Sequence, residues 1–418
     1  MRRSLITVVL ICAPAVFAMG QASESVLYSF GSNSTDGTYP IGGLLFDSAG
    51  NLYGTTTGGG QYCHSSGYYG CGTVYKLSPS ATGWNETVLY NFCTTGNENS
   101  CPDGAQPQDG LIFDAVGNLY GTTESGGATG FGTVFELSPP SLPGAQWTET
   151  VLWTFGGQKK GDGAYPSDGK LNWDKHGNLY GTTIVGGKEN LGTVFELSAS
   201  SGEWNESVLH SFDGADGNFP RFGVAIDQSG NLYGTTNIGG IVNTYSVCAS
   251  GCGLVYQLKP SNHGWTETVL YKFDGNDGAR PYSPISIDQS GNLYGTFEYG
   301  GNSVGCEYGC GGVFKLSPNG TGGLTKYSFD FDGQNGSNPE SGVLVDNASG
   351  ALFGTTGGEV YMIQGKKETV LYQFCSQPYC TDGESPQGGT LISRGNVLYG
   401  VTVDGGANQE GVVFSISK

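Results

Sequence analysis

One seven-residue phrase recurs along this chain and constrains its fold more than any other feature. GNLYGTT occupies residues 50–56 and returns at 117–123, 177–183 and 230–236, followed by GNLYGTF at 291–297. Two looser copies are GALFGTT at 350–356 and NVLYGVT at 396–402. The central aromatic residue recurs at steps of 46 to 67 residues, so the period is near 60.

The phrase belongs to a longer unit, seen in full at residues 107–155. This unit contains four short apolar runs, GLIFD, NLYGTT, GTVFELS and TVLWTF, which we name a, b, c and d. Each run has the length of a strand and is bounded by Gly, Pro, Asp or Ser. A D-x-x-G-N connection between a and b predicts a tight hairpin. Four antiparallel strands per period of this length predict a β-propeller blade, because a β-solenoid needs much shorter repeats.

The two ends of the repeat array predict how the ring closes. The array begins with SVLYSF at 25–30, a d strand alone, and ends with GVVFSIS at 411–417, a c strand without its d. The first strand can therefore complete the last blade and leave no open edge. We predict an all-β fold, a seven-bladed β-propeller with four-stranded antiparallel blades, in a single domain over residues 23–418.

The repeated phrase is interpreted as a packing motif between blades. Leu52 and Tyr53 point to opposite faces of a strand, and both faces of a blade are covered by its neighbours. Gly54 is expected to leave room for the backbone or a ring of the adjacent blade. A buried Tyr hydroxyl needs a hydrogen-bond partner, and the Thr pair of the phrase is one candidate.

The first 22 residues predict an export signal. Arg2 and Arg3 precede an apolar run from 5 to 17, and cleavage is expected after Ala18 or Ala22. The alternative is an uncleaved membrane anchor. We expect a secreted or periplasmic protein that is free of the membrane once the signal is removed.

The charge balance excludes some partners. The chain has 18 basic and 37 acidic residues, and residues 1–22 contain two Arg and no acid, which leaves a balance of 16 to 37, or −21. A surface with this excess repels nucleic acid and anionic lipid. Its simplest role is solubility outside the cell.

The cysteines that follow the export signal come in neighbouring couples. An exported chain with an even, locally paired set is typical of disulfides. The five predicted bridges are Cys63–Cys71, Cys93–Cys101, Cys248–Cys252, Cys306–Cys310 and Cys375–Cys380. A zinc site formed by the third and fourth couples is the alternative, although neither has C-x2-C spacing. On the propeller map all five couples lie in b–c or d–a loops, so one face would carry every bridge and the longest loops. Such a face is expected to bind a ligand; the alternative is protection from proteolysis.

The d–a loops also repeat a phrase, D-G-x-x-P. Its acidic residues are candidate ligand-binding groups near the axis, as a carboxylate collar for a cation or a polyhydroxylated molecule. They are Asp36, Asp103, Asp162, Asp216, Asp277 and Asp382, with Asn335 in the remaining copy. The alternative is that Asp-Gly forms the turn and Pro ends the strand. We expect no cofactor, and bound calcium stays a weak hypothesis because the D-x-D-x-D-G loop is absent.

Signals for catalysis are weak. The four His residues, at 64, 176, 210 and 263, occupy different repeat positions, and neither H-E-x-x-H nor G-x-S-x-G occurs. His210 replaces the Tyr of a d strand and is interpreted as a packed residue. We predict an exported, monomeric, non-catalytic binding propeller whose partner is an extracellular glycan or protein. One alternative is a carbohydrate-active enzyme, a polysaccharide lyase or glycoside hydrolase using carboxylates near the axis. Another is a purely structural surface protein.

The repeat resembles a known family. D-x-x-G-N-L-Y-G-T-T, followed by G-G, G-T-V-F-x-L-S and E-T-V-L-Y-x-F, is similar to the GloVer repeat of bacterial choice-of-anchor tandem repeat proteins. The resemblance covers nearly all of residues 25–417. It implies export and assigns no catalytic residues. Many members carry a C-terminal anchoring segment, whereas here Lys418 directly follows the last expected strand, so the sequence gives no support for surface anchoring.

Overall fold

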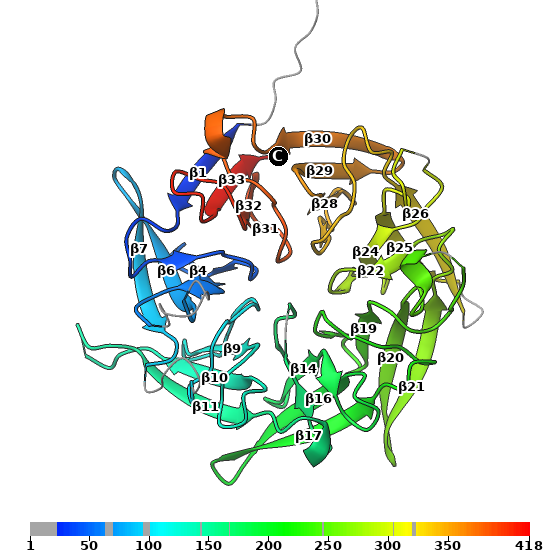
Figure 1. The fold of residues 1–418 in the computed structure, drawn as a ribbon, viewed down its shortest axis with the longest axis horizontal. Helices are drawn as coiled ribbons and strands as arrows, with labels where there is room; N and C mark the ends of the chain where they lie inside the picture. Colours follow the sequence, from blue (N-terminus) through cyan, green and yellow to red (C-terminus); the bar gives the residue numbers. More distant parts are fainter. Residues whose placement is uncertain are drawn as a thin grey trace, which may run out of the picture.

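The computed structural model describes residues 23–62, 70–94, 101–142, 144–166, 168–244, 246–303, 305–319 and 323–418. These residues form seven antiparallel sheets around a central axis, each an up-and-down meander (Figure 1). The chain is therefore all-β and folds as the predicted seven-bladed β-propeller. Within the described ranges, no helix is long and apolar enough to cross a membrane.

Each blade takes its strands in the order a, b, c, d from the axis outward. Blades 1 to 4 contain β3 (Leu45–Phe46), β4 (Leu52–Thr56), β6 (Thr73–Ser80) and β7 (Gly83–Asn91); β8 (Ile112–Phe113), β9 (Leu119–Thr123), β10 (Thr133–Ser138) and β11 (Thr148–Thr154); β13 (Asn172–Trp173), β14 (Leu179–Thr183), β16 (Thr193–Ser200) and β17 (Glu203–Ser211); β18 (Ala225–Ile226), β19 (Leu232–Thr236), β20 (Leu254–Ser261) and β21 (Gly264–Lys272). Blades 5 to 7 contain β23 (Ser286–Ile287), β24 (Leu293–Tyr299), β25 (Gly312–Pro318) and β26 (Leu324–Asp330); β27 (Leu344–Val345), β28 (Leu352–Thr355), β29 (Glu359–Gln364) and β30 (Lys367–Gln373); β31 (Ile392–Arg394), β32 (Val397–Thr402), β33 (Val412–Ser417) and β1 (Glu24–Ser29).

The predicted closure of the ring is confirmed. Strand β1 pairs antiparallel with β33, from Glu24 opposite Ile416 to Ser29 opposite Val412. Its register shifts between Val26 and Tyr28, as it does at the corresponding place between c and d strands in five other blades. The first strand therefore takes the geometry of an ordinary d strand, and the first and last segments of the chain lie side by side in one blade (Figure 1).

The repeated phrase packs blade against blade, as predicted. In the second copy Leu119 is fully buried and Tyr120 is 5% exposed, on opposite faces of β9. The Tyr120 ring lies edge-on to Trp173 of the next blade, with 4.9 Å between ring centroids. Equivalent contacts, such as Tyr53 with Phe113 at 5.2 Å, recur at other seams, by which we mean the boundaries between adjacent blades.

The Tyr hydroxyl of the phrase has a different partner from the expected Thr pair. Asp114, at the start of the a–b turn, accepts backbone N–H bonds from Val116, Gly117 and Asn118 through Oδ1. Its other oxygen, Oδ2, accepts the Asn118 amide at 2.9 Å and the Tyr120 hydroxyl at 3.3 Å. The Asp of D-x-x-G-N-L-Y thus ties the turn to the strand.

The Gly of the phrase makes room within its own blade, so the expectation of an adjacent blade was wrong. A Cβ on Gly121 would lie 2.7 Å from the Phe135 ring, which comes from the neighbouring strand β10. The tip of the ring reaches the glycine because the c strand places a large aromatic residue directly opposite it. We expect Gly121→Ala to lower the free energy of unfolding by about 1–3 kcal/mol through overpacking. Chemical denaturation would measure it, with Gly117→Ala in the open turn as the comparison for a backbone effect alone.

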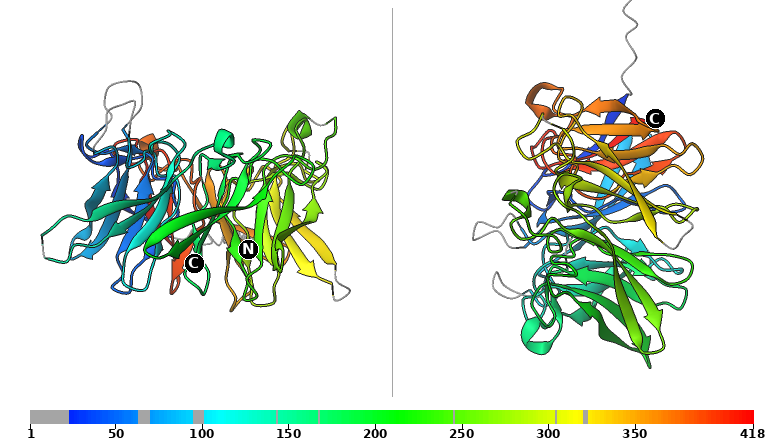
Figure 2. Two further views of the ribbon diagram at one scale, coloured as in Figure 1. Left: turned by 90° about the horizontal axis from the view of Figure 1, so that it is seen from below. Right: turned by 90° about the vertical axis from the view of Figure 1, so that its right-hand side faces the viewer.

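Additional short elements occur in the loops. They are β2 (Gly37–Thr38) paired with β5 (Gly58–Gly59), β12 (Gly163–Ala164) paired with β15 (Val185–Gly186), β22 (Ala279–Pro281) paired with β24, and the 3-10 turns η1 (Gln158–Lys160), η2 (Ser246–Cys248) and η3 (Pro378–Cys380). Each of these strand pairs joins a d–a loop to the b–c loop of the blade that follows it. Both loop types therefore lie on one face, and Figure 2 shows the 3-10 turns together on that side of the ring.

Candidate functional site

The loop face carries the predicted disulfides. Bonds join Cys93 to Cys101, Cys248 to Cys252, Cys306 to Cys310 and Cys375 to Cys380. Cys71 is also disulfide-bonded, and its predicted partner Cys63 lies outside the described residues. The third and fourth couples are each closed on themselves, so the zinc alternative is wrong for them.

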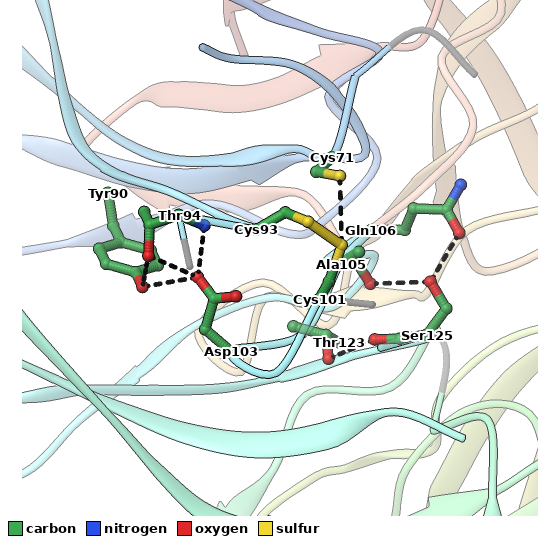
Figure 3. The surroundings of a disulfide bond; sticks show 10 residues. All are labelled: Cys71, Tyr90, Cys93, Thr94, Cys101, Asp103, Ala105, Gln106, Thr123 and Ser125. Carbon is green, nitrogen blue, oxygen red and sulfur yellow. Dashed lines mark hydrogen bonds between the residues drawn. A yellow bond between two sulfur atoms is a disulfide. The ribbon is translucent and has the colours of Figure 1, made fainter. Parts of the chain in front are cut away.

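Two neighbouring loops are in contact through the sulfur atoms of their cysteines. Cys71 Sγ, in a b–c loop, lies 3.8 Å from Cys101 Sγ, in the following d–a loop (Figure 3). Both cysteines are buried. The bridges therefore stiffen single loops and also bring adjacent loops into contact.

The six D-G-x-x-P acids lie beside the outermost strands rather than around the axis. Asp103 Oδ2 accepts the Thr94 N–H at 2.9 Å and the hydroxyl of Tyr90 on β7 at 2.8 Å (Figure 3). Each of the other five likewise bonds to the outer strand that precedes its loop, through Tyr28, Trp153, His210, Tyr271 or Tyr372. The six carboxylates are thus held apart, one per seam, each by its own turn. Their role as ligands stays a prediction.

His210 behaves as the sequence predicted for a packed residue. Its ring lies edge-on to Phe212 at 4.7 Å between centroids, and its Nε2 is 2.9 Å from Asp216 Oδ2. The histidine thereby replaces the Tyr hydroxyl that holds the Asp in other loops.

The sevenfold symmetry breaks immediately after the D-G-x-x-P phrase. The next residues enter the innermost strands, and their side chains differ from blade to blade. A second variable position follows the GTT of the phrase, with Glu124 in blade 2 and Glu298 in blade 5. We define the axial cluster as six side chains from these two segments, with Asp168 one residue further from the Pro than its counterparts: Glu124, Asp168, Arg221, Tyr282, Glu298 and Glu340.

Arg221 is the centre of the axial cluster. Its Nε donates to the Asp168 carboxylate of the preceding blade. Its guanidinium carbon lies 5.3 Å from the centroid of the Tyr282 ring of the following blade. Arg221 also acts electrostatically on Glu124 and Glu340, so one side chain influences groups from blades 2 to 6. One side chain can influence groups from so many blades only near the central axis, where the blades converge.

The three glutamates of the cluster hold protons more firmly than ordinary carboxyls, because their pKa values are raised. Burial raises the pKa of Glu340 to about 7, with Glu298 adding to the shift and Arg221 opposing it. Burial also raises the pKa of Glu124 and of Glu298. Near neutral pH these side chains therefore include both hydrogen-bond donors and acceptors. Perturbed carboxyls gathered in this way are typical of functional sites.

A hollow of about 300 Å³ lies between the b–c loops of blades 4 and 5. Disulfides close both loops, at Cys248–Cys252 and Cys306–Cys310. Its walls include Ser246, Val247, Asn276, Ser303, Glu307 and Tyr308. Tyr308 is 47% exposed and so offers an aromatic side chain at the rim.

Two side chains connect this hollow to the axial cluster. Tyr299, next to Glu298, lies edge-on to Tyr308 with 6.2 Å between ring centroids. Arg280 stands over the Tyr299 ring at 5.4 Å and donates to the Val247 carbonyl at 3.3 Å. The result is one continuous polar and aromatic surface over blades 4 to 6. We call it the asymmetric surface, formed by Arg221, Arg280, Tyr282, Glu298, Tyr299, Glu307, Tyr308 and Glu340.

The sequence did contain a signal for these residues, which the repeat-based interpretation missed. Aligning the copies on the Pro of D-G-x-x-P places Arg221, Tyr282 and Glu340 at one position, where blade 1 has Ile41. Departures from a repeat mark function because one ligand meets one set of groups, whereas the repeated positions build the scaffold.

Comparison with one solved structure agrees with the fold. The extracellular domain of BT3049 from B. thetaiotaomicron, assigned to the hybrid two-component systems, shares 12% identity at a TM-score of 0.52. That match covers 95% of this chain, which spans 41% of that structure. A structure from the nidogen/laminin complex shares 15% identity over 72% of this chain and 89% of the other, at a TM-score of 0.41. No curated protein matches in sequence. The Gloeobacter/Verrucomicrobia repeat matches residues 14–248 and 242–414, and the chain belongs to this repeat family.

Proposed function

We propose that this protein is an exported binding module that holds an extended, uncharged glycan along the asymmetric surface. The observation that carries the proposal is the concentration of non-repeated polar and aromatic groups on one side of a ring of near-identical blades. A scaffold alone needs no such difference between blades.

The chemistry of the surface suits a sugar chain. Carboxyls and guanidinium groups bond to pairs of hydroxyls, and the exposed aromatic side chain of Tyr308 can stack on the apolar face of a pyranose ring. The disulfides at both sides of the hollow limit loop motion, which reduces the entropy lost on binding. Disulfides are also typical of proteins that work in an oxidising, extracellular compartment.

The charge of the surface favours a neutral ligand. It combines three carboxyls, Glu298, Glu307 and Glu340, with two guanidinium groups, and Asp168 already neutralises one of these. An acidic polysaccharide would meet this excess of negative charge with only Arg280 left to oppose it. A protein partner is the other outcome of the test below.

A glycan array probed with the full mature protein tests the proposal. We expect retention on neutral oligosaccharides and at least tenfold weaker binding for Tyr308→Ala, which removes the stacking face. Tyr379→Ala is the matched control, because Tyr379 is an exposed ring on the same face of blade 7, at 88% exposure. Equal loss in both variants, or no retention of any glycan, would contradict the proposal.

One observation favours a second candidate, a glycoside hydrolase. Glu340 holds its proton up to about pH 7 beside Glu298. A general acid of this kind protonates the glycosidic oxygen as the C–O bond breaks, while a second carboxylate takes a proton from the water that bonds to the anomeric carbon. Turnover on a polysaccharide panel, lost in Glu340→Gln with binding retained, would identify the enzyme. Binding without turnover in the wild type supports the binding module.

A further inference from the structure

A second set of acids lies at the seams between blades, outside the asymmetric surface. Six of the seven d strands place a Glu opposite a buried apolar residue of the c strand, as Glu86 lies opposite Leu77. Each of the six keeps its Oε1 buried and without a hydrogen-bond partner: Glu24, Glu86, Glu149, Glu206, Glu267 and Glu368.

The D-G-x-x-P acids face these glutamates. Asp36, in the loop that enters blade 1, is the charged group that acts on Glu86 of that blade. Asp103 stands in the same relation to Glu149. The pairing continues with Asp162 and Glu206, Asp216 and Glu267, and Asp382 and Glu24. Two carboxyls therefore interact electrostatically within each partly buried seam.

The seam at blade 5 shows which group can lie beside the Asp when the Glu is absent. Lys326 takes the place of the Glu, opposite Leu316 of the c strand. Its ammonium lies 3.3 Å from Asp277 Oδ2. In this copy a positively charged side chain of the protein itself lies beside the Asp, at the repeat position where the other blades have a Glu.

Other seams satisfy the Asp differently. Both oxygens of Asp162 accept backbone N–H bonds, from Gly156 and Gly163. Both oxygens of Asp382 do so too, from Ser376 and Gln377. Asp216 is bonded to His210. At blade 6 the D-G-x-x-P acid is replaced by Asn335.

Two seams have none of these solutions. Asp36 and Asp103 are only 3% and 5% exposed, yet Oδ1 of each is buried without a partner. Their glutamates, Glu86 and Glu149, keep an unpartnered oxygen as well. A buried carboxylate oxygen without a hydrogen-bond partner destabilises the folded state unless it binds a cation or a proton. In each of these seams two such oxygens belong to acids that act on each other electrostatically.

We propose that the Asp36–Glu86 and Asp103–Glu149 pairs each bind one divalent cation of the calcium class, which bridges the seam as Lys326 does at blade 5. Hard carboxylate oxygens are the ligands that calcium prefers, and water completes its coordination. A site with two carboxylates is expected to bind in the range of about 10⁻⁴–10⁻³ M, as in extracellular modules. This proposal is independent of the glycan site.

The proton is the competitor for these sites. Burial, reinforced by the facing Asp, raises the pKa of Glu86 to about 7 and of Glu149 to about 8. At pH 8 Glu86 is therefore mostly ionised and Glu149 about half ionised, so a metal ion can compete for both pairs, whereas at pH 5 both glutamates hold protons.

Thermal unfolding of the full mature protein at pH 8 tests the proposal. We expect 10 mM calcium, added to chelator-treated protein at constant ionic strength, to raise the Tm by a few degrees. The double change Asp36→Asn and Asp103→Asn should remove this shift. Asp277→Asn is the matched control, since it alters the same repeat position where Lys326 already lies, and it should keep the full calcium shift.

Two further measurements do not depend on the stability of the Asn variants. Tyr28 and Tyr90 donate to Asp36 and Asp103, so terbium bound at either seam should luminesce when tyrosine is excited, and calcium should displace it. Glu86→Lys copies blade 5 and should raise the calcium-free Tm. Absence of terbium luminescence, or a calcium shift that survives in the double Asn variant, would overturn the proposal. A Tm that rises at pH 5 but never with calcium would likewise overturn it and assign the pairs to protons.

Discussion

Protein that lacks residues 23–31 is expected to be insoluble or to lose most of its stability. The deletion removes β1, and with it the outer strand of blade 7 and the fully buried Phe30. The Phe30 ring also lies 4.9 Å from the Tyr75 ring of blade 1, centroid to centroid. The propeller would therefore lose a contact between blades 7 and 1 as well as the outer strand of blade 7. Replacing a buried Phe by Ala costs about 3–5 kcal/mol, and whole domains are stable by only about 5–15 kcal/mol.

Thermal unfolding of the deletion and of a chain that starts at Ser23 makes the comparison. Phe30→Ala provides an intermediate case that should remain soluble with a lowered Tm. Equal melting of the deleted and complete chains would mean that the first strand does not close the ring.

Calcium-free protein should be more stable at pH 5 than at pH 8.5. Burial raises the pKa of Glu24, Glu86 and Glu368 to about 7, and of Glu149 and Glu206 to about 8. An acid whose pKa is raised by folding stabilises the native state fully below its unfolded pKa near 4.5. This stabilisation disappears as the pH rises through the folded value. The loss should therefore occur between about pH 5 and pH 8.5.

The size of this effect is limited by partial exposure of the glutamates. With allowance for screening by water, we expect roughly 1 kcal/mol from each, and several degrees of Tm in total. Glu206→Gln should reduce the pH dependence, because an amide resembles the protonated acid. Glu203→Gln, at the exposed start of the same strand β17, should leave it unchanged. A Tm that rises steadily from pH 5 to pH 8.5 in chelator would contradict the assignment.

The fold could be predicted because the repeat specifies the number and order of the strands in each blade. The period near 60, the four apolar runs and the displaced d strand at the start together specify seven blades and their closure. Local partners were harder to predict: the sequence alone does not show that Asp114, rather than a Thr, meets Tyr120. The same holds for Gly121, whose neighbouring ring comes from its own blade, because register decides which aromatic residue lies over it.

The candidate site was predicted only at the level of the face that carries it. The cysteine couples indicated the loop face, whereas the repeated Asp residues predicted a site at positions that build the turns, and the variable positions beside them form the surface. Arg221 and Glu340 lie more than a hundred residues apart in sequence, and only convergence at the axis brings their charges together. The exchange of Glu for Lys326 could be interpreted only once its register opposite Leu316 placed it in a seam.

Hydrogen exchange with and without the glycan best retained on the array tests the central claim most directly, namely that one side of a near-symmetric ring binds the ligand. We predict slower exchange in peptides that contain Tyr282, Tyr299 and Tyr308, and no change in the equivalent peptides of blades 1 and 7, which contain Gly43 and Gly388. Protection spread equally over all seven blades, or located in the c–d hairpins of the opposite face, would contradict it.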